Sequence, residues 1–212
     1  MEWRDDHSMD RKKQTLEYYR VNADSFVEGA MKADLSATRK KFTAFLPAGA
    51  FILDFGCGPG RDTNAFLEAG YKVDAIDGSP EMCARASEYT GIQVKNMLFN
   101  ELDARNRYDG VWACASILHL PEEELTEVIR RIETALKNGG IFYTSFKYGE
   151  GAKDRGGRFF TDYTEKSLPV YWASVTSMKI IDLWISHDTR PGREEERWTN
   201  LLAGKSSIEK DL

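Results

Sequence analysis

Three closely spaced glycines and one acidic residue have the types and spacing that bind a nucleoside-like ligand. Gly56, Gly58 and Gly60 follow the apolar run of residues 51–53. Because glycine has no Cβ, such a segment makes a tight turn and lets a ligand approach the backbone closely. Asp77 ends the next apolar run, where a carboxylate is placed to accept hydrogen bonds from both hydroxyls of a ribose. Together these residues favour an adenosine-containing ligand over a plain glycine loop.

The glycine spacing separates two classes of cofactor. A nicotinamide or flavin site requires the pattern G-x-G-x-x-G, which brings a helix N-terminus to a pyrophosphate. The pattern here is G-x-G-x-G, and Arg61 stands where the third glycine would fall. S-adenosylmethionine has no pyrophosphate, so close backbone approach is sufficient for it. The spacing favours S-adenosylmethionine, and a nicotinamide oxidoreductase is the alternative that Arg61 opposes.

These residues require alternating strands and helices to position them. Asp62 and Thr63 are predicted to cap the helix after the glycine turn, which ends at Gly70. Ser79 and Pro80 are predicted to start the helix after Asp77. The remaining strands are expected at residues 92–94, 111–115, 141–146, 178–186 and 198–203, with a helix at 122–137. This order predicts an α/β fold with a parallel sheet that ends in an antiparallel pair of strands.

Four segments carry a resemblance to a known family. In chain order they resemble the motifs of class I S-adenosylmethionine-dependent methyltransferases: residues 52–60, 73–79, 108–120 and 136–141. The resemblance covers about residues 14–204. It implies a Rossmann-like, doubly wound, mostly parallel seven-stranded sheet with an antiparallel C-terminal strand. It also implies S-adenosylmethionine as cofactor, S-adenosylhomocysteine as product, and methyl transfer by direct displacement.

The resemblance further implies which residues hold the cofactor. They are expected in the N-terminal segment, the two strand ends and the loops that follow: Tyr19, Asp54, Gly56, Gly58, Gly60, Arg61, Asp77, Gly78, Ser79, Met82, Met97, Leu98, Phe99 and Ala115. Leu98 departs from the family, which often has an acidic residue there to accept a hydrogen bond from adenine. Apolar contacts, a backbone N–H such as that of Phe99, or the side chain of Asn96 or Asn100 are expected to replace it.

The acceptor is expected beyond the carboxyl ends of the fourth and fifth strands. Ser116, His119, Tyr148 and Arg158 are the candidate substrate residues. His119, Lys147 and Tyr148 are the candidates for a catalytic role. Alignment and desolvation of the reactants do most of the work in a direct displacement, so a base is needed only where the acceptor must lose a proton.

Two segments are expected to cover the site. Residues 1–34 are predicted to form an N-terminal helical lid in which Tyr19 closes over the cofactor, and residues 35–212 the methyltransferase domain. An ordinary amphipathic helix is the other interpretation of the N-terminal segment. Residues 149–158 are charged and rich in glycine, which predicts either a flexible lid or a solvated loop.

Composition limits the partners. The 212 residues carry a net charge of −5, and Lys and Arg are scattered along the chain, which argues against a nucleic-acid substrate. The three cysteines are not spaced as a zinc site, and no apolar run reaches the length of a membrane span. We expect a cytoplasmic, metal-free monomer or weak dimer that acts on a small molecule. An RNA or protein methyltransferase and a non-catalytic cofactor-binding module are the alternatives.

Overall fold

A seven-stranded sheet forms the centre of the molecule. The structure is a computed structural model that describes residues 5–206, with side chains from residue 11 onward. The strands lie in the order β3-β2-β1-β4-β5-β9-β8, and their bounds are β1 Phe51–Phe55, β2 Lys72–Asp77, β3 Lys95–Asn96, β4 Tyr108–Ala113, β5 Leu136–Lys147, β8 Lys179–His187 and β9 Arg197–Gly204. β9 pairs antiparallel with both of its neighbours, while the pairs from β3 to β5 are parallel. The predicted fold class, including the antiparallel C-terminal strand, is confirmed.

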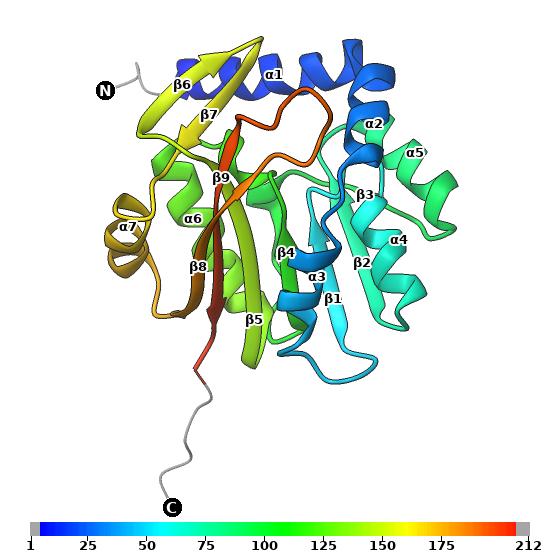
Figure 1. The fold of residues 1–212 in the computed structure, drawn as a ribbon, viewed down its shortest axis with the longest axis vertical. Coiled ribbons are helices and arrows are strands. Elements are labelled where there is room, and N and C mark those ends of the chain that lie inside the picture. The colour runs from blue at the N-terminus through cyan, green and yellow to red at the C-terminus, as the bar shows by residue number, and fades with distance from the viewer. Residues whose placement is uncertain (1–4, 207–212) are drawn as a thin grey trace, which may run out of the picture.

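Helices cover both faces of this sheet (Figure 1). Their bounds are α3 Ser36–Thr43, α4 Arg61–Glu68, α5 Pro80–Thr90, α6 Glu122–Ala135 and α7 Ser167–Val175. α3 and α4 pack on one face through Phe42 and Phe66, which contact Trp112 of β4. α6 packs on the other face through the apolar stripe at residues 125, 128, 129 and 132, as its helical spacing predicts. The central strands are therefore buried on both sides.

Two further units cross the carboxyl ends of the parallel strands (Figure 1). The N-terminal helices are α1 (Asp5–Val21) and α2 (Ala23–Lys32). The second unit is an antiparallel hairpin of β6 (Gly151–Arg155) and β7 (Arg158–Asp162), which pack beside α1. The hairpin corrects the expectation of an irregular loop at 149–158. Gly156 and Gly157 both have positive φ and form its two-residue turn, the geometry that matches the twist of paired strands.

Two local predictions were wrong. The third strand is β3 at residues 95–96 rather than 92–94, because the segment pairs with β2 only where it runs beside Ile76 and Asp77. Asp62 and Thr63 lie inside α4, whose N-cap is Gly60 with φ +89°. A Cβ on Gly60 would lie 2.8 Å from Thr90, so the close packing of α4 on α5 requires glycine there. The cap prediction failed because the side chains of Asp62 and Thr63 bond elsewhere, as described below.

Candidate functional site

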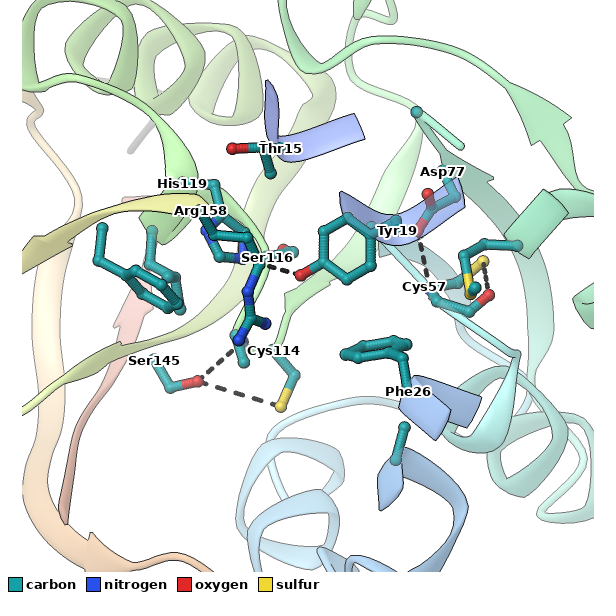
Figure 2. A pocket seen from close by; sticks show the side chains of 18 of the residues that line it. Thr15, Tyr19, Phe26, Cys57, Asp77, Cys114, Ser116, His119, Ser145 and Arg158 are labelled. Atoms are coloured by element: carbon teal, nitrogen blue, oxygen red, sulfur yellow. Dashed lines mark hydrogen bonds between the residues drawn. The ribbon is translucent and has the colours of Figure 1, made fainter. Parts of the chain in front are cut away.

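A deep pocket opens at the carboxyl ends of β1, β2, β4 and β5, beneath α1, α2 and the hairpin. Figure 2 shows the side chains that point into it. Most of the residues expected from the sequence line this pocket: Tyr19, Asp54, Gly56, Gly58, Arg61, Asp77, Gly78, Met82, Met97, Leu98, Phe99, Ala115, Ser116, His119, Lys147 and Arg158. Gly60, Ser79 and Tyr148 do not line it. Gly60 and Ser79 are instead the N-caps of the helices that follow the first two strands.

The glycine turn and Asp77 are bonded to each other. The backbone N–H of Gly58 donates to Oδ2 of Asp77 at 2.9 Å, and that of Ser79 donates to Oδ1 at 2.8 Å. Burial raises the pKa of Asp77, and these backbone hydrogen bonds oppose the rise. Each carboxylate oxygen can accept a second hydrogen bond. Asp77 therefore fixes the turn and retains acceptor capacity toward the pocket.

The ring of Phe26 lies close to Gly58 of the glycine turn. The φ of Gly58 is +54°, and a Cβ built there would lie 3.6 Å from the ring of Phe26 on α2. A side chain at this position would fill the gap between the glycine turn and α2. Gly58 and Phe26 both line the pocket, and we call the part of it that they and Asp77 border the slot. Because Gly58 has no Cβ, its backbone forms this wall of the slot.

Buried charges support the turn from behind. Asp54 accepts a hydrogen bond of 2.5 Å from the hydroxyl of Thr63 on α4, and burial together with the nearby charge of Asp62 raises its pKa to about 7. Asp62 is paired with Arg39 and Arg61, each at 2.6 Å. Asp54 therefore orders the turn through α4 and not through the N–H groups of the loop.

The apolar residues expected to contact adenine are in the pocket wall. Met82, Met97, Leu98 and Phe99 all line the pocket. Of the two asparagines expected to compensate for Leu98, Asn96 donates to the carbonyl of Asp77 at 3.1 Å and does not line the pocket. Asn100 does line it. The structure therefore leaves Asn100 as the asparagine in position to contact a ligand.

The loop after β4 is held in a strained conformation. Ala115 has φ +50°, a region that residues with a side chain rarely adopt. Its N–H donates to the hydroxyl of Ser145 at 2.9 Å, while the hydroxyl of Ser116 donates to the carbonyl of Phe55 at 2.6 Å. Because the hydroxyl of Ser116 donates its hydrogen bond to Phe55, this side chain attaches the loop to β1.

His119 is bonded on both ring nitrogens. Nδ1 lies 2.7 Å from the carbonyl oxygen of Phe159 on β7, and Nε2 lies 2.9 Å from the hydroxyl of Tyr19 on α1. A carbonyl only accepts, so Nδ1 carries the hydrogen and Tyr19 donates to Nε2. Burial, reinforced by the charge of Arg158, lowers the pKa of His119 to about 4. The imidazole is therefore neutral near pH 7 and directs the Tyr19 hydroxyl.

The two remaining candidates for a catalytic role are placed differently. Lys147 lines the pocket but is paired with Glu196 and with Asp188, and its ammonium lies 3.7 Å from the centre of the Trp198 ring. Burial lowers its pKa, and the bond to Glu196 opposes this. Tyr148 lies outside the pocket, with the guanidinium of Arg197 3.9 Å above its ring. Lys147 is therefore part of an ion-pair cluster with Asp188 and Glu196, and Tyr148 lies outside the pocket.

Comparison with known proteins identifies the domain. Residues 52–140 match the family model of a methyltransferase domain. The match supports the resemblance to S-adenosylmethionine-dependent methyltransferases over this segment of the chain. The chain is 33% identical over 106 residues to the ubiquinone biosynthesis O-methyltransferase of Xanthomonas axonopodis. The match covers 47% of this chain and 44% of the relative. The chain is 30% identical over 122 residues to the N-terminal Xaa-Pro-Lys N-methyltransferase 1 of Rattus norvegicus, covering 51% and 55%.

The chain spans about half the length of the curated relatives that it matches. Among solved structures it resembles the Burkholderia thailandensis 1,6-didemethyltoxoflavin-N1-methyltransferase, determined with S-adenosylhomocysteine bound. The TM-score is 0.73 at 24% identity, over 91% of this chain and 85% of that one. At this identity the likeness shows a shared fold.

Several residues of the pocket were not expected from the sequence. Thr15, Phe26, Ser145, Trp198 and Asn200 line it, and they come from α1, α2, β5 and β9. Only the aromatic character of the segment around Phe26 gave a signal in the sequence. Within residues 5–206, no helix is long and apolar enough to cross a membrane, and no group of three or more potential ligands has a metal-binding arrangement.

Proposed function

We propose that this protein is an enzyme that transfers the methyl group of S-adenosylmethionine to a small organic acceptor. The observation that carries the proposal is the bond between Gly58 and Asp77 in the wall of the pocket. It joins the two chain segments that a nucleoside-containing ligand must contact together. Gly56 and Gly58 would lie against the amino-acid end and the sulfur, and Asp77 would accept from the ribose hydroxyls.

The adenine would lie between Met82, Met97, Leu98 and Phe99, with Asn100 as the polar contact. Bound there, S-adenosylmethionine supplies a methyl group that leaves its sulfur as the acceptor's electron pair attacks, with S-adenosylhomocysteine as the other product. The protein aligns the acceptor and excludes water. Tyr19 and Phe26 contribute by covering the slot, since their rings lie 4.8 Å apart in edge-to-face contact above the glycine turn.

A small acceptor is favoured by what covers the pocket. α1 and the β6–β7 hairpin lie over the strand ends and meet at His119, which bonds both Tyr19 and Phe159. A protein N-terminus, the acceptor named for one group of relatives, would have to pass these covering elements. The chain also resembles a ubiquinone biosynthesis O-methyltransferase and a 1,6-didemethyltoxoflavin-N1-methyltransferase, and the second of these has the small molecule 1,6-didemethyltoxoflavin bound.

A transfer assay tests the proposal. S-adenosylmethionine carrying an isotopic label in its methyl group is incubated with the protein and a cell extract divided into small-molecule and protein fractions. We expect label in the small-molecule fraction, with Asp77→Ala protein as the matched blank. Label confined to the protein fraction would mean that the acceptor is a protein and not a small molecule. Label in neither fraction would favour a non-catalytic cofactor-binding module.

A further inference from the structure

Arg158 has an unusual environment for a partly buried cation. It lies at the start of β7, and its side chain points into the pocket (Figure 2). Its Cζ atom lies 4.2 Å from the centre of the Tyr18 ring, 5.2 Å from that of Phe160 and 5.9 Å from that of Tyr19. Its Nε is buried and has no hydrogen-bond partner in the described part of the chain. The guanidinium is thus held by aromatic rings rather than by an acid.

The other basic side chains around the pocket differ in this respect. Those within the pocket wall each have a carboxylate partner: Lys147 with Glu196, Arg61 with Asp62, Arg190 with Asp188 and Arg193 with Glu196. Arg11 at the rim lies over Phe159 and is exposed to solvent. Arg158 combines an inward position with the lack of any carboxylate partner among residues 11–206.

A partly buried guanidinium without a counter-ion is costly, because water is withdrawn and no negative charge replaces it. Contacts with aromatic faces recover only part of that cost. Tyr19 and His119 both interact with Arg158, and neither supplies a negative charge, because the Tyr19 proton lies in the bond to a neutral His119. An anion from outside the chain would complete the site, and a carboxylate matches the guanidinium with two parallel hydrogen bonds.

The surroundings also indicate the shape of that anion. Tyr19, Phe26, His119 and Phe160 line the pocket next to Arg158 and contact one another edge to face. Such an arrangement presents ring faces and edges to a planar ligand. We propose that Arg158 binds the carboxylate of a planar aromatic acceptor, whose ring lies against these four side chains. The inference rests on the proposed function and deepens it by naming the acceptor class.

The carboxylate that binds Arg158 could also be that of the cofactor. The two possibilities predict different effects of removing the Arg158 guanidinium on cofactor binding in the absence of an acceptor. If Arg158 bound the cofactor, its loss would weaken S-adenosylhomocysteine binding directly. If it binds the acceptor, S-adenosylhomocysteine affinity is unchanged and only the acceptor is affected.

Calorimetry separates these outcomes. Benzoate is titrated into protein saturated with S-adenosylhomocysteine, and benzamide, its neutral analogue, serves as the matched ligand. The variants are Arg158→Gln, which removes the charge, and Arg158→Lys, which keeps the charge but not the planar fork. Lys153→Gln is the control variant, because Lys153 lies on the same hairpin, is about half exposed and does not line the pocket.

We expect the wild type to bind benzoate more tightly than benzamide. Benzoate affinity should fall about tenfold or more in Arg158→Gln, as for loss of a charge-assisted hydrogen bond, and less in Arg158→Lys. Lys153→Gln should match the wild type, and all variants should bind S-adenosylhomocysteine equally. Equal affinity for the two ligands in the wild type, or equal benzoate affinity in wild type and Arg158→Gln, would overturn the proposal. So would weaker S-adenosylhomocysteine binding by Arg158→Gln.

The same titrations distinguish failure of the proposed function from failure of the Arg158 proposal. If the wild type does not bind S-adenosylhomocysteine, the cofactor assignment is wrong. The Arg158 proposal would then still be supported if the protein without S-adenosylhomocysteine binds benzoate, and if this binding is lost in Arg158→Gln and retained in Lys153→Gln.

Discussion

The hydroxyl of Tyr19 lies 2.9 Å from Nε2 of His119, although the two residues are 100 positions apart in the chain. The opposite ring nitrogen of His119 donates to the carbonyl of Phe159. One imidazole therefore joins α1, the loop after β4 and the β6–β7 hairpin. Both units that cover the pocket are attached to the sheet at this point.

Removing the hydroxyl of Tyr19 should loosen this junction. Tyr19→Phe leaves Nε2 of the buried His119 without a donor, which should cost about 1–2 kcal/mol of unfolding free energy. Urea denaturation measures the change. Tyr18→Phe is the matched control, because the Tyr18 hydroxyl has no hydrogen-bond partner in the described part of the chain. Equal losses in the two variants would show that the Tyr19–His119 bond contributes nothing specific.

The protonation of His119 predicts a pH dependence of stability. Its pKa is about 4 in the folded protein, against an ordinary value of 6.5 for a solvated histidine, so the folded state binds fewer protons between these values. Stability is complete above pH 6.5 and falls as the pH drops to 4, by about 3 kcal/mol for this group. Urea unfolding at pH values between 4 and 7 should show this contribution as a difference between the wild type and His119→Gln that grows as the pH rises. The opposite contribution of Asp54, whose pKa is raised to about 7, is present in both proteins and cancels in the difference. Parallel curves for the two proteins would contradict the assignment of a neutral imidazole.

The core of the fold followed from the sequence because its signals are local. The alternation of Ile52 and Leu53 toward opposite faces, and the spacing of Leu125, Val128 and Ile132, each arise within one element. The β6–β7 hairpin was missed because β6 is exposed along its length and lacks an apolar pattern. Its stability comes from pairing with β7, which a local pattern in β6 does not reveal.

In the candidate site, some contacts could likewise be predicted from the sequence and others could not. Gly58 and Asp77 lie at the ends of adjacent parallel strands, so topology alone brings them together. The bond between Tyr19 and His119 depends on how α1 crosses the strand ends, and this depends on tertiary packing. The unpaired state of Arg158 is likewise a property of its surroundings in space, because acidic residues flank it in the sequence at Asp154 and Asp162.

Asp77 should affect both ligand binding and stability. Asp77→Ala is expected to weaken S-adenosylhomocysteine binding by about 2–3 kcal/mol, since charge-assisted bonds to the ribose are lost. The bonds from Gly58 and Ser79 also disappear, so the unliganded protein should melt at a lower temperature. Asp74→Ala is the control on the same strand, where the carboxylate bonds to Arg107 and does not line the pocket. Equal cofactor affinity in both variants would make Asp77 purely structural.

A side chain at Gly58 should block the slot. Gly58→Val places branched atoms between the turn and Phe26, at a φ of +54° that valine rarely adopts. Gly91→Val introduces similar backbone strain at φ +74°, in open space at the end of α5. We expect both variants to lose stability and only Gly58→Val to lose S-adenosylhomocysteine binding, as measured by calorimetry. Normal binding by Gly58→Val would mean that the turn does not face the ligand.

The central claim is that the slot between the glycine turn, Asp77 and the N-terminal helices holds S-adenosylmethionine. The most direct measurement is a calorimetric titration of the wild-type protein with S-adenosylmethionine, S-adenosylhomocysteine and NAD. We predict saturable one-site binding of the first two and none of NAD, because Arg61 and its partner Asp62 occupy the start of α4 where a pyrophosphate would have to lie. Tighter binding of NAD than of S-adenosylhomocysteine would contradict the claim.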